Sequence, residues 1–488
     1  MRILFSVETP LSLITYRSVV QELGRRGHDV VIAIHSDRPV SWRDSLLAQV
    51  EAVPGVAVEA APEPAPDRWL ELSADLRSSR DLFQFLSPRF GETYRKRAWK
   101  RAPRPAAGVA RTRLGRSGPG RATVLGGLRV VERALPTNGE IEAYLRSRRP
   151  DVVLFTPYLG LRSIQPEFLR AAQALGLRTA ICVRSWDNLS SKSVIRPLPD
   201  RLFVWNEIQR EEAASLHGMP PDRVAVTGAQ CFDEWFGRQP RPREEFAARA
   251  GLDPARPFVL YVCGSPWTGQ TEVDFVRRWV AAIRGRPGAA ADAAVLVRPH
   301  PKRPDAWKEV DRSGLDCVVV FPDEARPPVD DEAKADYFDS IHHSAAVVGL
   351  NTSAMIEAAI VGRPVLTVLD PEYERVQEGT LHFRYLLEVG GGLLSVSRTL
   401  DEHVDRLSAV LAGEAGAPAE RFVREFVRPH GLDVAATPLF VDEVERLAAS
   451  AAPRPRRTPA PLLPLRPLLA PLAGRSARYA GIGRELEA

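Results

Sequence analysis

The stretch VVGLNTSAMIEAAIVGRPVLTV, residues 347–368, contains the transition that decides the fold. An apolar run ends at three small polar residues, a short helical pattern follows, and a Gly-Arg-Pro break precedes a second apolar run. Gly362 allows the helix to stop, and Pro364 prevents it from resuming. This strand–helix–strand order is typical of a parallel α/β sheet. Packing explains both apolar ends, but not the polar residues at the junction or the glutamate inside the helix.

Two interpretations of the junction are open. Ligands of open parallel sheets bind outside the carboxyl ends of the strands. Asn351 or Thr352 would cap the short helix, so that its first amides point at a ligand there. Ser353 adds a hydroxyl, and Glu357 lies one turn further on the same face, where it would accept hydrogen bonds from a ribose diol. The alternative is that the polar residues only cap the helix and that Glu357 is solvated.

The same alternation continues on both sides of this stretch. The later series has apolar runs at 258–264, 294–301, 317–323, 345–350 and 364–369, with helical patterns between them. The earlier series has apolar runs at 2–7, 29–34, 151–156, 179–183, 201–205 and 223–228. Two series of similar size predict an α/β protein of two doubly wound, Rossmann-like domains facing across a cleft, rather than one barrel.

The chain is long enough for two such domains with additions. We expect domain 1–235 with an irregular basic insertion at about 36–130, a Pro- and Arg-rich linker at 236–257, and domain 258–418. A helix over 419–448, which could cross back, and a disordered Pro/Arg-rich tail over 449–488 complete the prediction.

Composition indicates a globular protein, because 44% of the residues are hydrophobic and 26% are charged. No apolar run approaches the ~20 residues that cross a bilayer, and the N-terminus does not read as a signal peptide. We therefore expect a cytoplasmic protein. The four cysteines have no metal-binding spacing and are expected to be buried thiols.

The net charge of +5 is unevenly distributed. Between Arg89 and Arg129 there are twelve Lys and Arg residues against one acidic residue, Glu92. The stretch could be a solvated, partly disordered face, or it could attach the protein to an anionic membrane surface or a lipid-diphosphate acceptor. Nucleic acid is not expected as a partner, since no recognition motif for it is present.

Further candidate residues follow other strands of the second series. Gly264 and Ser265 follow the first strand, and Arg298, His300 and Lys302 follow the second, in VRPHPK. Small residues, hydroxyls and cations are what a pyrophosphate group requires. Two prolines hold His300 so that its imidazole could donate to an anion at little entropic cost. Alternatively, the histidine only shapes the loop.

The pattern RPHP…GLNTSAMIEAAIVGRPV resembles the C-terminal half of GT-B-type glycosyltransferases. The nearest group is that of bacterial CDP-glycerol glycerophosphotransferases and UDP-N-acetylglucosamine 2-epimerases. VAVTGAQCFDEWF at 224–236 and YRSVVQELGRRGHDVVIAI at 16–34 are similar to other parts of the same group. The resemblance implies that the His-Pro loop and the Ser353/Glu357 helix hold a nucleotide diphosphate. It covers most of residues 1–35 and 150–448. Segment 36–130 matches no pattern of the group, and the loop ETPLSLITY after the first strand lacks the glycine-rich or His-bearing signature common in glycosyltransferases.

Catalytic candidates come from the first series, where Glu8 follows the first strand and Asp187 follows TAICV. An inverting transferase needs a base near the acceptor hydroxyl and positive groups near the departing diphosphate. Either residue could instead cap the next helix. The GT-B resemblance implies that no metal or other cofactor is needed, and no DxD sequence occurs where a metal site would be expected.

We therefore expect a metal-independent glycosyltransferase that moves a sugar from a nucleotide-sugar donor to a cell-envelope or capsule-type acceptor. Such a protein could be peripheral on the inner face of the membrane. A glycerophosphate or polyol-phosphate transferase and a sugar-nucleotide epimerase are the alternatives on this fold. A non-catalytic, nucleotide-binding or glycan-binding scaffold subunit is the alternative of another class.

Overall fold

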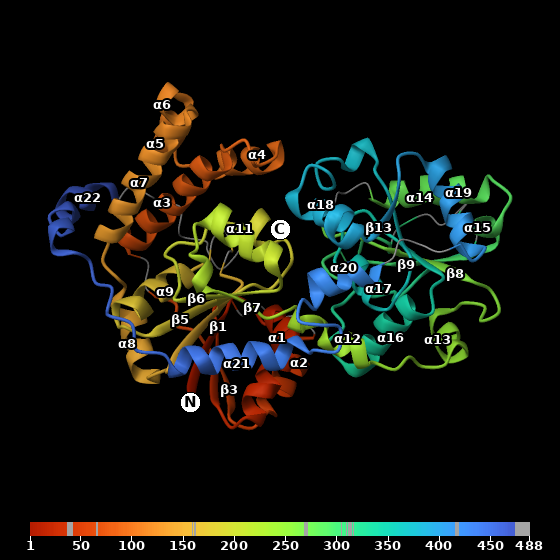
Figure 1. Ribbon diagram of the computed structural model, residues 1–488, viewed down its shortest axis with the longest axis horizontal. Coiled ribbons are helices and arrows are strands. Elements are labelled where there is room, and N and C mark those ends of the chain that lie inside the picture. The colour runs from red at the N-terminus through yellow and green to blue at the C-terminus, as the bar shows by residue number, and fades with distance from the viewer. Residues whose placement is uncertain are drawn as a thin grey trace. The chain divides into compact units, whose positions relative to one another are not determined.

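The computed structural model describes residues 1–36, 42–64, 67–158, 160, 163–267, 272–303, 305–308, 310, 315, 317–414 and 419–473. The chain divides into two compact units (Figure 1). Unit 1 consists of Met1–Cys231 together with the chain from Ala435 onward, and unit 2 consists of Phe232–Val434. Each unit has its own parallel sheet, as the two series of strands predict.

The described strands of unit 1 follow the order β3-β2-β1-β4-β5-β6-β7. They are β1 (Arg2–Val7), β2 (Asp29–Ile34), β3 (Val56–Ala60), β4 (Val152–Thr156), β5 (Arg178–Cys182), β6 (Arg201–Val204) and β7 (Val224–Val226). In register, Leu4 of β1 lies beside Val31 of β2 and Val153 of β4. The strand order therefore reverses between β1 and β4, the position where an open sheet forms a crevice at its carboxyl edge.

Alternate residues of the central strand bury opposite faces of this sheet. Phe5 packs edge-on against Tyr16 of α1 (Leu11–Arg25), which packs in turn against Phe440 of α21 (Ala436–Ala449). Leu4 belongs to a core cluster with Ile141 of α8 (Gly139–Arg148) and Phe168 of α9 (Gln165–Ala174). Continuous apolar strands are expected where helices cover both faces.

The segment 36–130 was predicted to be irregular, and this prediction is wrong. Its described part contains α2 (Arg43–Glu51), β3, and the helices α3 (Arg68–Phe85), α4 (Glu92–Arg101), α5 (Arg104–Arg111), α6 (Arg113–Arg116) and α7 (Gly118–Ala134). The orange ribbons of Figure 1 show α3 to α7 as an arm of unit 1. Helices α5 to α7 bury only alanine and glycine, so no periodicity of large apolar residues marks them.

Unit 2 repeats the same topology. The described strands follow the order β10-β9-β8-β11-β12-β13, so the order reverses between β8 and β11. They are β8 (Phe258–Val262), β9 (Ala294–Arg298), β10 (Val318–Val320), β11 (Ala346–Val348), β12 (Val365–Val368) and β13 (Leu394–Ser397). The helices around them are α14 (Glu272–Arg284), α15 (Ala289–Asp292), α16 (Asp331–His342), α17 (Ala354–Ile360), α18 (Leu381–Glu388) and α19 (Leu400–Leu411).

The predicted linker, 236–257, instead packs as part of unit 2. It contains the end of α12 (Asp233–Gly237) and the whole of α13 (Arg243–Ala250). Arg241 bonds to Asp336 at 2.5 Å and to Asp339 at 2.6 Å, and Arg249 bonds to Asp336 at 2.9 Å. Arginines that look like features of a solvated linker therefore fasten this segment to α16.

The C-terminal part also differs from the prediction. Instead of one helix over 419–448, α20 (Ala419–Phe422) and a π-helical turn (Val423–Val427) precede the separate helix α21. The tail was predicted to be disordered, yet its described part includes α22 (Leu465–Ala473). Pro467 lies in the first turn of α22, where an amide has no helical partner, so only Pro471 costs a helical hydrogen bond. Residues 474–488 lie outside the described chain.

No helix in the described ranges is both long enough and apolar enough to cross a membrane. All four cysteines are free thiols: Cys182 and Cys263 are buried, Cys231 is half-buried and Cys317 is exposed. The expectation of buried thiols therefore fails at Cys317, which begins its apolar run at the surface.

Candidate functional site

The residues predicted to bind a ligand in unit 2 follow three neighbouring strands, β9, β8 and β11. Because these strands are parallel, the chain leaves all three at the same edge of the sheet. The strand order reverses between β8 and β11, so this edge is the expected position of a ligand. The topology thus brings to one edge Gly264, Ser265, Arg298, His300, Lys302, Asn351, Thr352, Ser353 and Glu357.

His300 is held in one tautomer by its own loop. The backbone N–H of Lys302 donates to Nδ1 of His300 at 3.0 Å, so the neutral ring carries its proton on Nε2. Burial, followed by the nearby charges of Lys302 and Arg303, lowers the pKa of His300 to about 4. The ring is therefore neutral at pH 7 and has one N–H to donate.

Beside this loop lie Arg298, which is buried, and Tyr337 and Glu357, which are half-buried. The guanidinium of Arg298 stacks on the Tyr337 ring at 4.4 Å from the ring centre, and the Tyr337 hydroxyl donates to Glu357. Nη1 of Arg298 is buried and has no hydrogen-bond partner among the described residues. Burial lowers the pKa of Arg298 to about 10, so the side chain is still a cation at pH 7. Tyr337 lies on α16, and no feature of the sequence pointed to it.

Glu357 is not the solvated residue of the alternative interpretation. It is half-buried, and burial raises the pKa of its carboxyl to about 7 although the Tyr337 hydroxyl and Arg298 act to lower it. Near neutral pH the group is therefore divided between the acid and the carboxylate. It can change its hydrogen-bonding role within the physiological range.

The junction itself differs from the prediction in one respect. Of the two predicted caps, only Thr352 contacts the start of α17: its hydroxyl oxygen accepts from the N–H of Ala354 at 3.5 Å, whereas Ser353, directly before the helix, makes no side-chain cap hydrogen bond. The Asn351 amide donates instead to the carbonyl of Val376, a partner too distant in sequence to be predicted locally. The end of α17 follows the prediction, since Gly362 has φ of 73° and the amide of Arg363 bonds to the Ala358 carbonyl at 2.9 Å.

Gly264 is held by a residue that the sequence did not indicate. Its backbone N–H donates to both carboxyl oxygens of Glu272, at 2.8 and 3.0 Å. Glu272 is buried at the start of α14, and burial raises its pKa to about 7. The Gly264 amide therefore has an internal partner, while its neighbour Ser265 is only half-buried. Trp267, two residues further along the chain, is 46% exposed.

In unit 1, Glu8 lies at the reversal point between β1 and β4. It is buried and accepts a hydrogen bond from the Ser163 hydroxyl. Burial raises the pKa of Glu8, opposed by Ser163 and by the charge of Arg77. A carboxyl group with a raised pKa at a strand end has the properties of a general base.

Asp187 has a more structural environment. Its carboxyl group accepts from the hydroxyls of Ser185 and Ser191 at 2.7 and 2.8 Å, and Lys192 lies 3.8 Å away. It precedes α10 (Asn188–Ser191) but makes no side-chain cap hydrogen bond to it. The carboxylate therefore holds its own loop together, which leaves less of it to accept a proton.

Two other observations concern possible sites in the described ranges. No group of three or more His, Cys, Asp or Glu residues is arranged to hold a metal ion there. The prediction that no metal takes part stays a prediction. A cavity of about 920 Å³ in unit 2 lies at the far end of α17, around Ile360 and Pro364. It is therefore separate from the carboxyl edge.

No protein-family model and no curated protein sequence matches the chain. Solved structures do match. UDP-GlcNAc 2-epimerase from Methanocaldococcus jannaschii is 14% identical with a TM-score of 0.51, over 91% of this chain and 99% of that one. The S. aureus MnaA–UDP co-structure is 14% identical with a TM-score of 0.51, over 91% and 96%. A glycosyltransferase from Rickettsia africae ESF-5 is 9% identical with a TM-score of 0.51, over 92% and 99%. At these identities the similarity shows the fold, which is GT-B, with two Rossmann-like units.

Proposed function

We propose that this chain, which has the GT-B fold, is a glycosyltransferase that uses a nucleotide-sugar donor. One observation carries the proposal. The His300 loop follows β9 and the Ser353 junction follows β11, and these strands lie on either side of the reversal point in unit 2. This is the position at which doubly wound sheets bind nucleotides. The side chains there are cations, hydroxyls and a neutral histidine, the groups that suit a diphosphate.

The donor-binding roles follow from the local chemistry. The Nε2–H of His300 donates to a phosphate oxygen, and the unpartnered Nη1 of Arg298 provides a second donor together with positive charge. Ser353, exposed at the start of α17, and Ser265 add hydroxyls, and Lys302 adds charge. Glu357, when ionised, accepts from the ribose hydroxyls, and charge on the departing diphosphate is stabilised by the cations.

Glu8 is the better candidate for the catalytic base. Burial raises the pKa of its carboxyl, which makes it a stronger base toward an acceptor hydroxyl, whereas the Asp187 carboxylate is occupied by its own loop. We place an envelope-type or capsule-type glycan, or a lipid-linked sugar, as the acceptor. The arginine-rich helices of unit 1 support work at the inner face of a membrane.

A second candidate is a sugar-nucleotide epimerase, because one of the structures similar to this chain, from Methanocaldococcus jannaschii, carries the name UDP-GlcNAc 2-epimerase. An epimerase inverts one carbon of the sugar, either while the sugar is attached to the nucleotide or after the sugar has been released. It needs no acceptor. The same contacts of unit 2 would serve it.

A panel of nucleoside diphosphates and sugar nucleotides separates these cases. A ligand that binds only the folded chain raises its melting temperature, which identifies the base and the sugar. The donor so found is then incubated with the wild type and with Glu8→Gln. Release of nucleoside diphosphate that depends on an acceptor supports the transferase, and an isomerised sugar nucleotide supports the epimerase. Binding without turnover in any mixture would leave a non-catalytic subunit.

A further inference from the structure

Unit 1 contains a second cavity, of about 1010 Å³, that the proposed function does not use. Helix α9 lines it from Pro166 to Ala174, and the loops that precede β6 and β7 contribute Pro197, Leu198 and Arg223. Other walls come from α3, α7 and the C-terminal segment 456–466. The cavity thus reaches the amino ends of strands, whereas Glu8 lies at the carboxyl edge.

The lining is strongly basic. Among the described residues, ten arginines and three glutamates line the cavity. Such a surplus of arginines over glutamates gives the concave surface a positive electrostatic potential, which attracts anions. Whether it represents a ligand site depends on how many of the arginines the protein itself neutralises.

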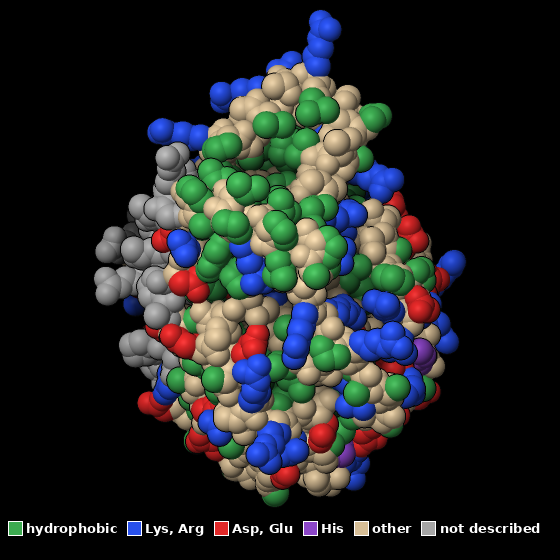
Figure 2. Space-filling view, turned by 90° about the vertical axis from the view of Figure 1, so that its left-hand side faces the viewer, with side chains coloured by type: hydrophobic (Ala, Val, Ile, Leu, Met, Phe, Trp, Pro, Cys, Tyr) green, Lys and Arg blue, Asp and Glu red, His purple; other side chains and the backbone are tan. Residues whose placement is uncertain are grey.

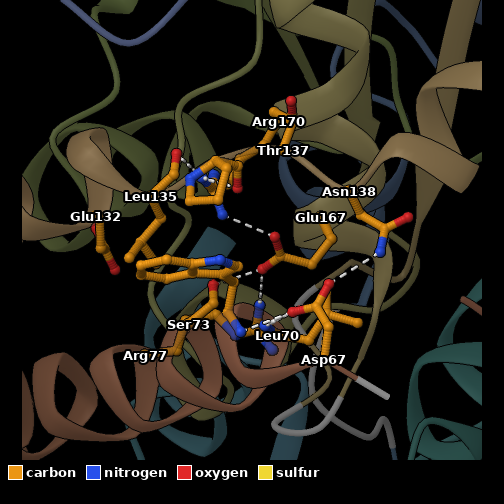
Figure 3. A network of polar contacts seen from close by, with 12 residues as sticks. Asp67, Leu70, Ser73, Arg77, Glu132, Leu135, Thr137, Asn138, Glu167 and Arg170 are labelled. Atoms are coloured by element: carbon orange, nitrogen blue, oxygen red, sulfur yellow. Dashed lines mark hydrogen bonds and ion pairs between the residues drawn. The ribbon is translucent and has the colours of Figure 1, made fainter. Parts of the chain in front are cut away.

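All three glutamates are already paired. Glu167 accepts from Ser73 at 2.5 Å, from Arg77 at 2.9 Å and from Arg170 at 2.8 Å, as Figure 3 shows. Burial alone would raise the pKa of Glu167, but Arg170 and Arg77 lower it, so the group is ionised.

The other two glutamates are neutralised in the same way. Arg80, which does not line the cavity, binds Glu132 at 2.6 and 2.7 Å, and Arg146 binds Glu142 at 2.5 Å. No glutamate in the lining is left for the remaining arginines.

Several arginines of the lining therefore lack a carboxylate partner. Arg129, Arg133, Arg223 and Arg457 make no side-chain hydrogen bond or ion pair with any described residue. Arg196 bonds only to backbone carbonyls, at 2.8 Å from its own neighbour Ile195 and also to His217. Burial and then the like charges of Arg80 and Arg129 lower the pKa of Arg196 to about 10. Like charges gathered at one cavity are stabilised by a bound anion.

The remaining walls indicate what kind of anion fits. They combine polar neutral side chains, such as Thr137 and Gln173, with aliphatic ones, such as Leu135, Leu198 and Leu463, and no described residue of the lining is aromatic. Protein sites for unpaired nucleobases commonly stack the base on an aromatic side chain. Arginine forks match phosphate oxygens in pairs, and a cavity of this volume has room for more than one phosphate.

An exposed apolar surface adjoins the mouth. Leu463 lines the cavity and is 43% exposed, and exposed leucines continue along α22 at Leu468 and Leu472. Figure 2 views the side on which α22 lies in Figure 1. It shows hydrophobic side chains gathered on the upper part of this side, with Lys and Arg side chains around them. Such a border of leucines and arginines suits the interface of an anionic bilayer.

We propose that this cavity of unit 1 is a second binding site, for a ligand that carries two or more phosphate charges and no nucleobase. The ligand is either a soluble oligophosphate or the phosphate headgroup of a lipid whose chains rest against the α22 leucines. Both share the chemistry that the unpartnered arginines recognise. The site is independent of the donor site in unit 2.

The test uses a variant that removes charge without removing contacts. Arg129→Gln, Arg133→Gln and Arg457→Gln are combined, since none of these side chains has a partner to lose. The matched control combines Arg104→Gln, Arg113→Gln and Arg116→Gln, which lie on the same arm, carry the same charge and do not line the cavity. Thermal melting confirms that both variants are folded.

Two probes distinguish the sources of the phosphate. Inorganic tripolyphosphate is titrated by calorimetry, and phosphatidylcholine vesicles with and without ~10 mol% phosphatidic acid are used for co-sedimentation. We expect the full-length protein to bind at least one probe, with a loss of about tenfold or more in the cavity variant and about twofold or less in the control. Binding of tripolyphosphate alone identifies a soluble ligand, and binding of the phosphatidic acid vesicles identifies a lipid headgroup. The proposal is overturned if neither probe binds, or if the control loses as much affinity as the cavity variant.

Discussion

At the scale of single residues, the His300 ring is the clearest donor toward a phosphate. Its Nδ1 accepts from the backbone and its pKa is about 4, so it donates through Nε2 over the whole neutral range. We expect His300→Ala to weaken binding of the nucleoside diphosphate by about tenfold, the value of one hydrogen bond to a charged group. His300→Gln, which can place an N–H near the same position, is expected to retain most of the affinity. Titration calorimetry at roughly physiological pH measures the affinity of the wild type and of both variants for the nucleoside diphosphate. Equal affinity of the wild type and the alanine variant would exclude the phosphate contact.

Glu357 makes a prediction about pH. Its pKa of about 7 lies above the usual 4.5, so the carboxylate fraction rises from about one tenth at pH 6 to about nine tenths at pH 8. If the carboxylate accepts from the ribose, affinity for the nucleotide rises with pH across this window. Ionisation of the ligand itself also changes the affinity with pH, and it does so equally for the wild type and for Glu357→Gln. The difference between the two plots of affinity against pH therefore gives the contribution of Glu357. Parallel slopes in wild type and variant would contradict the assigned role.

At the scale of elements, Gly349 controls how closely β11 approaches β8. A Cβ atom at this position would lie 2.9 Å from Val262 Cγ2 and 3.2 Å from the Val262 carbonyl oxygen. Gly349→Ala should therefore push the strands apart at the reversal point and destabilise unit 2 by about 1–3 kcal/mol. It should also weaken nucleotide binding, because the His300 loop and the Ser353 junction shift relative to each other.

Gly362→Ala provides the comparison for this prediction. A Cβ atom there meets nothing within 4 Å, but the glycine has φ of 73°. The substitution should cost about 1 kcal/mol through backbone strain alone and leave nucleotide affinity unchanged. Urea unfolding and calorimetry of both variants test the pair. A Gly349→Ala protein that binds as well as Gly362→Ala would show that the β8–β11 spacing does not matter to the site.

The elements also show what could be predicted from the sequence. The central strands are continuous apolar runs, so their number and order along the chain were readable before the fold was known. Strand β13 was missed because its four residues, Leu394–Ser397, are only half apolar and follow a run of glycines. Helices α5 to α7 were missed because they bury alanine and glycine. Asn351 bonds to Val376, 25 residues further along the chain, which no local pattern reveals. Gly264 bonds to Glu272, only eight residues away at the start of the next helix, but this contact depends on how the intervening loop folds.

At the scale of the whole molecule, helix α21, near the C-terminal end of the chain, belongs to unit 1. It buries Phe440, Val441, Val444 and Leu447, and Phe440 packs against Tyr16 and Phe203 with ring centres 5.9 and 5.1 Å away. Four such side chains contribute about 8 kcal/mol, comparable to the stability of a domain. A chain ending at Val434 should therefore lose the cooperative melting of unit 1 while unit 2 still binds nucleotide.

A chain that ends at Ser450 is the control, since it keeps α21 and removes only the tail. Both of its units should be folded and should show cooperative melting transitions, but the cavity wall formed by 456–466 is removed. Scanning calorimetry with and without nucleotide distinguishes the two truncations. If the chain ending at Val434 still showed an intact unit 1, the packing of α21 would not be essential.

The central claim is that the carboxyl edge of unit 2 holds a nucleotide diphosphate between the His300 loop and the Ser353 junction. Hydrogen–deuterium exchange of the full-length protein, with and without the nucleoside diphosphate that stabilises it most, tests this directly. We predict slower exchange at 263–267, 298–303 and 349–357, and unchanged exchange around the arginine-lined cavity of unit 1. Protection confined to other segments, with these three unchanged at saturating nucleotide, would contradict the claim.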